Sequence, residues 1–213
     1  MSIAYNDLVG DICGYLQIRT TDIDKFEVGI SLNRAQDHLL NVLKPRYLVN
    51  AVRTWKGNLL DGEPAYQWPI NFIRFLKMWI DYENSITHTN IGREARLVGD
   101  TELLNTSNID LLPSKEHPVV SMGMEGGFEI RPIPDADVNE AWRLRYVAKL
   151  PKIASDQPCL LRDNLRNLLT FYATSLSAGV ENYSPEISQT FLGFYKEELE
   201  FLQPKSLPTK EEQ

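Results

Sequence analysis

The 213-residue sequence has few cysteines and no long apolar run. Its two cysteines, Cys13 and Cys159, lie far apart, and two residues alone form neither a four-ligand zinc site nor a disulfide framework. No window approaches the roughly 20 consecutive apolar residues that a membrane-spanning helix needs. The first residues also lack the basic and apolar segments of a signal peptide. We therefore expect a protein of a reduced compartment, with no membrane partner.

An excess of basic charge is also absent. Lysine and arginine total 22 against 29 aspartate and glutamate residues, which gives a formal net charge of -7. Nucleic-acid binders need clustered basic side chains that displace counterions from phosphates, and no segment of this chain is basic. We interpret the arginines at 93 and 96 and those at 143 and 145 as solvated or paired surface charges. A mildly acidic surface would suit a channel through which DNA slides without sticking.

Motifs for catalysis or metal binding are also missing. His38, His88 and His117 stand apart from one another and from the cysteines, outside any HExxH, CxxC or triad pattern. The glycines between residues 123 and 127 lack the spacing and the lysine of a phosphate-binding loop. We therefore predict that the chain is not an enzyme and that it holds no cofactor and no metal.

The sequence does contain a helical pattern at each end. Apolar residues recur every three or four positions in four stretches, as on one face of an amphipathic helix. The first expected helix starts near Ser2 and breaks at 19–22, and the second ends at Pro45. The third follows a cap at Ser155 or Asp156, and the fourth runs from a cap at Ser184 to Pro204.

Between about Leu48 and Leu150 the helical period gives way to β-branched and aromatic runs. Apolar and polar residues alternate along 141–148, which is typical of a half-buried strand. The paired glycines that end 124–127 indicate a hairpin turn, and 100–105 indicates one or two helical turns. The strand candidates are 48–55, 72–82, 118–122, 127–132 and 141–148.

These patterns predict an α+β fold, in which the terminal helix pairs form a four-helix bundle with an inserted antiparallel β-rich region. The expected divisions are N-terminal bundle helices at 1–47, an inserted β-rich domain at 48–150, C-terminal bundle helices at 151–203 and a tail at 204–213. The tail has two prolines and few apolar residues, so alone it should be extended.

A series of short motifs runs from the first expected helix into the β-rich region. They read YNDLVGDI at 5–12, LNRAQ at 32–36, PRYL at 45–48, GEPAY at 62–66, WP at 68–69 and NFIR at 71–74. With PSKEHP at 113–118 and EIRPIP at 129–134, they resemble the head-to-tail adaptor proteins of tailed bacteriophages. These proteins are also called connector or head-completion proteins, and tail tubular protein A of short-tailed phages is related to them.

The resemblance implies a structural protein of the virion, located at the portal vertex or neck and assembled in the host cytoplasm. It implies a ring, usually of twelve copies, that binds beneath the portal protein, extends the DNA channel and gives the tail or neck protein an attachment platform. Genomic DNA would pass through the ring without sequence-specific binding. Candidate portal contacts in the last helix and tail are Phe194, Leu199, Phe201, Leu202 and Leu207, and candidate subunit or tail contacts are Trp55, Trp68 and Met124.

Two other functions fit the same sequence. The chain could be the tubular tail protein of a short-tailed phage, which shares the connector role but meets different partners. It could instead be a carbohydrate-binding or glycan-hydrolysing virion protein that uses its tryptophans to stack on sugars and paired carboxylates to cleave them. The residues concerned are Trp55, Trp68, Trp79, Trp142, Asp81, Glu83, Glu94 and Glu129. We favour core filling or subunit contact for the tryptophans.

Overall fold

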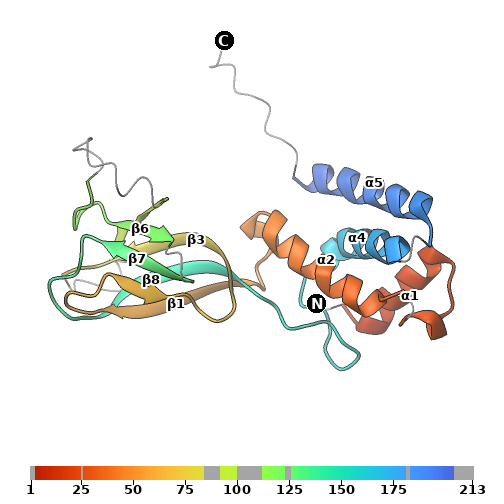
Figure 1. Cartoon of the computed structure of the whole chain (residues 1–213), viewed down its shortest axis with the longest axis horizontal. Coiled ribbons are helices and arrows are strands. Elements are labelled where there is room, and N and C mark those ends of the chain that lie inside the picture. The colour runs from red at the N-terminus through yellow and green to blue at the C-terminus, as the bar shows by residue number, and fades with distance from the viewer. Residues whose placement is uncertain are drawn as a thin grey trace, which may run out of the picture. The chain divides into compact units, whose positions relative to one another are not determined.

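The computed structural model describes residues 3–24, 26–83, 92–99, 112–122, 126–180 and 183–203. By its internal contacts the chain divides into two compact units. Residues 1–51 and 149–213 form the helical unit, and residues 52–148 form the β unit (Figure 1). The expected helix at 100–105, the first half of the expected turn at 124–127 and the tail at 204–213 lie outside the described residues.

The helical unit is organised around its third long helix. Its helices are α1 (Tyr5–Leu16), α2 (Val28–Val42), α4 (Arg166–Gly179) and α5 (Pro185–Leu202). Helix α4 packs against each of the other three, and Figure 1 shows α5 lying along it. Its buried residues include small ones, such as Ala173 and Ala178, which let neighbouring helices approach on several sides. The guanidinium of Arg166 ties α4 to α1 through two hydrogen bonds to Asp11 (2.7 and 2.9 Å).

The segment that leads into α4 is held by side chains of α2. Asn33 accepts a hydrogen bond from the backbone N–H of Ile153 (2.8 Å) and donates to the carbonyl oxygen of that residue (3.2 Å). Gln36 donates to the carbonyl oxygen of Pro151 (2.9 Å). Backbone polar groups removed from water need partners, and these two amides supply them where no helix or sheet does. Both residues belong to the LNRAQ motif at 32–36.

The β unit consists of two four-stranded sheets. The first sheet has the order β1 (Val52–Leu59), β8 (Val138–Ala148), β3 (Phe72–Ile80) and β4 (Arg93–Glu94), and its pairs are antiparallel. The second has the order β2 (Ala65–Gln67), β7 (Gly127–Arg131), β6 (Val119–Met122) and β5 (Arg96–Val98). Strands β5 and β6 are parallel, whereas the other pairs of this sheet are antiparallel.

Side chains of both sheets form the core of the β unit. The alternating residues Trp142, Leu144 and Tyr146 of β8 are buried, as their period-two pattern predicts. Phe128 and Ile130 of β7 belong to the same cluster. The indole N–H of Trp142 donates to the carbonyl oxygen of Asn58 (2.9 Å), so the one polar atom of this ring is satisfied.

The expected four-helix bundle with an inserted antiparallel β region is wrong. The fold is α+β with similar amounts of helix and strand, its strands form two sheets, and one strand pair is parallel. In the helical unit, α4 is buried on several sides while α5 buries a single side chain, so the apolar stripes do not meet in one shared bundle interior. Stripe periodicity shows that each helix has an apolar side but not how many neighbours cover it.

Candidate functional site

Helix α5 leaves two of its large apolar side chains exposed. Of its 18 residues only Tyr195 is buried. The helix begins as the sequence predicts, since the Ser184 hydroxyl accepts a hydrogen bond from the backbone N–H of Ile187 (3.4 Å) and Pro185 occupies the first turn. Phe194 is 44% exposed and Phe201 is 85% exposed. These two residues are seven positions apart and so project from the same side of the helix. We call them the α5 flank.

Aromatic packing fixes one end of this flank. Phe194 contacts Phe171 of α4, with ring centroids 5.8 Å apart, and also Phe191 (5.6 Å). Phe191 in turn lies 4.9 Å from the ring of Tyr15 in α1. Phe194 is therefore held in place while part of its ring stays accessible, as suits a preformed contact surface.

The last turn of α5 is anchored by the PRYL motif at 45–48. The Tyr47 hydroxyl donates to the carbonyl oxygen of Leu202 (2.6 Å), which is one of the carbonyl groups that a helix end leaves unpaired. The backbone N–H of Lys44 donates to Oε1 of Gln203 (2.8 Å). The guanidinium of Arg46 lies 4.7 Å from the Tyr47 ring centroid. The sequence shows the motif but not this role, because its partner lies 155 residues away.

The structure places the predicted contact residues in different settings. Phe194, Leu199, Phe201 and Leu202 lie on α5, and Leu199 and Leu202 are half-buried. Leu207 and Met124 lie outside the described residues. Trp55 is 36% exposed and contacts Trp142 edge-on at 5.0 Å, whereas Trp68 stacks on Phe72 at 4.2 Å against the core of the β unit.

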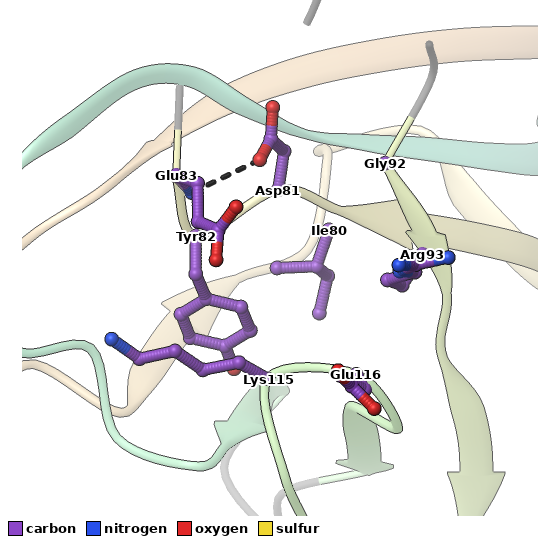
Figure 2. Close-up of a pocket in the computed structure, with 8 residues that line it drawn as sticks. All are labelled: Ile80, Asp81, Tyr82, Glu83, Gly92, Arg93, Lys115 and Glu116. Carbon is purple, nitrogen blue, oxygen red and sulfur yellow. Dashed lines mark hydrogen bonds between the residues drawn. The ribbon is translucent and has the colours of Figure 1, made fainter. Parts of the chain in front are cut away.

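A polar cavity of about 300 Å³ lies at the end of β3 (Figure 2). Its lining comes from residues 80–83, 92–93 and 115–116. Asp81 is only 5% exposed, and its Oδ1 accepts a hydrogen bond from the backbone N–H of Glu83 (3.0 Å). Tyr82 donates to the carbonyl oxygen of Pro132 (2.8 Å), and its burial raises the pKa of the phenol. Lys115 binds the carboxylate of Asp135 at 2.8 and 2.9 Å.

The acids of this cavity do not form a shared ligand set. Figure 2 shows the carboxylates of Asp81, Glu83 and Glu116 pointing in different directions. Across the described part of the chain, no three His, Cys, Asp or Glu side chains gather to hold a metal ion. Two other acids considered for glycan cleavage are in ion pairs, Glu94 with Lys77 (2.9 Å) and Glu129 with Arg131 (3.1 Å).

The outer face of the first sheet gathers basic side chains that are scattered in the sequence. Residues paired across antiparallel strands project on the same face, and these lie on the face opposite the core residues Trp142, Leu144 and Tyr146. The pairs are Lys56 with Arg143, Lys77 with Arg145, and Arg74 with Val147. From the sequence, the alternation along β8 is enough to predict that Arg143 and Arg145 share a face. The other three cations can be placed beside them only once the strand register is known.

No family model and no curated protein matches this chain. The likeness to phage adaptors therefore rests on the motifs of the sequence. Among the described helices, none is both long and apolar enough to cross a membrane.

Proposed function

We propose that this chain is a structural virion protein, a head-to-tail adaptor. It would form a ring beneath the portal, extend the DNA channel and offer the tail or neck protein an attachment platform. The sequence motifs suggest the family, and the α5 flank is the observation that carries the proposal. A chain that keeps Phe201 85% exposed on an ordered helix has a surface suited to a protein partner.

The energetics of the flank favour docking over solvation. Burying a phenylalanine side chain is worth about 1.5 to 3 kcal/mol. The anchor at Leu202 and the aromatic contacts of Phe194 hold the helix before any partner arrives. Less ordering entropy is then lost on docking, which raises affinity. Residues 204–213 follow α5 directly in the sequence, and with Leu207 they would extend the same contact.

The first experiment is cryo-electron microscopy of the chain mixed with the portal protein encoded in the same phage DNA. An added ring of density at the narrow end of the portal is the expected result, and it would also give the number of copies. A well-folded chain that never associates with the portal would contradict the proposal. Density on the tail side of another connector would instead identify a tail tubular protein.

Phe201→Ser should weaken portal binding about tenfold or more, because the variant lacks the phenyl ring that docking would bury against the portal. Its matched control is Ile70→Ser in the β unit, which removes another highly exposed apolar side chain, and this variant should bind as wild type does. A second variant, truncated after Gln203, tests Leu207. If the ring forms on the portal while both α5 variants bind normally, the adaptor function stands and the contact residues lie elsewhere.

A further inference from the structure

Strand β1 forms one edge of its sheet and pairs along one side only. Strand β8 lies on that side, and among the described residues no strand pairs with the other side. The ladder with β8 runs without a break from Val52 to Gly57, and a bulge follows before Leu59. The backbone N–H and C=O groups on the open side of an edge strand have no ladder partner. Strand β1 therefore presents a row of hydrogen-bonding groups that another strand can use.

The middle of β1 is open on both faces of the sheet. Residues 53–56 are all exposed, whereas a strand that borders a core normally alternates between buried and exposed side chains. Trp55 and Arg53 lie opposite the core residues Leu144 and Tyr146, so both project on the core side of the sheet. Trp55 nevertheless stays 36% exposed. An added strand would extend the core side of the sheet and cover this ring.

The ring of Trp55 is held in place before any partner arrives. It meets the buried ring of Trp142 edge-on, with centroids 5.0 Å apart. The Trp142 ring is fixed in turn by its hydrogen bond to the carbonyl oxygen of Asn58. An ordered side chain loses little entropy when it is covered, and tryptophans carry much of the binding energy at protein interfaces. We therefore expect a partner to place an apolar side chain against Trp55.

The charge of β1 selects among partners. Residues 48–60 contain two cations, Arg53 and Lys56, and no acid. Glu140 pairs with Lys56 (2.8 Å) and offsets its charge. The guanidinium of Arg53 donates a hydrogen bond to the carbonyl oxygen of Val52 (3.2 Å), and within the described part of the chain it has no ion pair. Opposite charges at directly opposed positions stabilise strand pairing, so the residue that faces Arg53 is expected to be acidic.

We propose that β1 binds an extended acidic segment of another protein as an added antiparallel strand. The segment pairs with residues 52–56, covers Trp55 with an apolar side chain and sets a carboxylate beside Arg53. Backbone hydrogen bonds give affinity in this mode of recognition, and the two side-chain positions give specificity. A second copy of β1 is a poor occupant, because it would bring two further cations against the first two. The inference concerns the β unit alone and does not rest on the adaptor proposal.

The probe is a head-to-tail cyclised β-hairpin peptide with Asn-Gly turns, because a closed hairpin is ordered before it binds. One of its strands reads Glu-Val-Thr-Glu-Val, which in antiparallel register sets its first valine against Trp55 and its second glutamate against Arg53. A second hairpin has lysine in place of both glutamates. The acidic hairpin should shift the NMR amide signals of residues 52–56 in the isotope-labelled full chain and slow their hydrogen exchange. The basic hairpin should bind at least about tenfold more weakly.

Three variants test the two side-chain contacts. Trp55→Ser should weaken binding of the acidic hairpin about tenfold or more, because the ring that the valine covers is gone. Leu97→Ser is the matched control, since Leu97 is 40% exposed on the edge strand β5 of the other sheet, and it should bind as wild type does. Arg53→Glu should reverse the preference, so that the basic hairpin binds more tightly than the acidic one. Circular dichroism checks that each variant is folded, and Arg53→Glu changes an exposed side chain, so the charge test stands even if Trp55→Ser unfolds.

Three outcomes would overturn the inference. The first is an absence of shifts in β1 with millimolar acidic hairpin, and the second is equal binding of the acidic and basic hairpins to the wild-type chain. The third is self-association of the free chain, measured by sedimentation, that Trp55→Ser abolishes and Leu97→Ser does not. That result would assign the edge to a second copy of this chain. Portal binding is measured separately, so a failure here leaves the adaptor proposal unaffected.

Discussion

At position 57, a close contact with the neighbouring strand requires glycine. A Cβ atom at this position would overlap Cζ2 and Cε2 of Trp142, which is paired with Gly57 in the sheet. The Trp142 ring is 3% exposed, and its N–H is bound to Asn58, so it has little freedom to move aside. Glycine is required here by close approach, even though strands usually disfavour it.

We expect Gly57→Ala to destabilise the β unit by about 3 kcal/mol, because overpacking a closed core forces side chains off their rotamers. Urea unfolding followed by tryptophan fluorescence measures the change.

Gly10→Ala is the matched control, since a Cβ at that position in α1 would meet nothing within 4 Å beyond its chain neighbours and the backbone of its own helix. Alanine should stabilise this helix by about 0.5 to 1 kcal/mol. Equal stability of wild type and Gly57→Ala would show that the Trp142 ring shifts freely.

At the scale of single elements, a ring cluster links three helices. Nε2 of His38 in α2 lies 3.0 Å from the Tyr195 hydroxyl of α5, and its ring stacks on Tyr172 of α4 at 4.3 Å. Burial lowers the pKa of His38 and raises the pKa of Tyr195 to about 12. At neutral pH the phenol therefore keeps its proton and can donate it to the neutral imidazole.

This cluster should make stability depend on pH below 7. The folded pKa of His38 lies below the unfolded value of 6.5, so the unfolded chain takes up its proton first as pH falls. Stability from this group is present above pH 6.5 and declines as pH drops through that value. His38→Gln should show a smaller loss of urea midpoint between pH 7 and pH 5.5 than wild type.

His117→Gln is the control for this measurement, because His117 is exposed in the β unit. It should lose as much stability over the pH range as wild type does. If the His38 and His117 variants behave alike, His38 does not couple the helices to pH.

The ends of elements were predictable where local chemistry decides them. The cap at Ser184, the proline after it and Pro204 predicted the last helix, and α5 runs from Pro185 to Leu202. The third expected helix was wrong at its start, because α4 begins only at Arg166. Residues before it form an extended segment held by Asn33 and Gln36, and no local pattern reveals partners more than 110 residues away.

The candidate surfaces were predictable to different degrees. The apolar stripe of α5 was visible in the sequence, but not which part of it stays exposed, since that depends on how α4 covers it. The group of basic side chains on the first sheet was missed, because Lys56, Lys77, Arg143 and Arg145 come from β1, β3 and β8 and meet only through the strand register. The net charge of a continuous segment does not show cations that come together from separate strands.

At the scale of the whole molecule, the β unit has its own hydrophobic core. Every member of its buried cluster, from Leu59 to Ala148, lies within residues 52–148. A segment with a complete core can fold alone.

We therefore expect residues 52–148, expressed alone, to give a cooperative urea transition and a well-dispersed NMR spectrum. Trp142→Ser in the same segment is the matched control and should lose both properties, because it removes the central ring. A collapsed segment without a cooperative transition would show that the β unit needs the rest of the chain.

The pairing of β1 with β8 has a consequence for the chain on either side of it. Val52 faces Val147 in the ladder, so the polypeptide begins and ends the β unit at neighbouring positions. Once these strands pair, residues 51 and 149 are held close together whatever length of chain separates them. Folding of the β unit therefore already accounts for the entropy lost on closing this long loop. A longer or shorter turn inside the β unit should then not change the entropy lost when α1 and α2 assemble with α4 and α5.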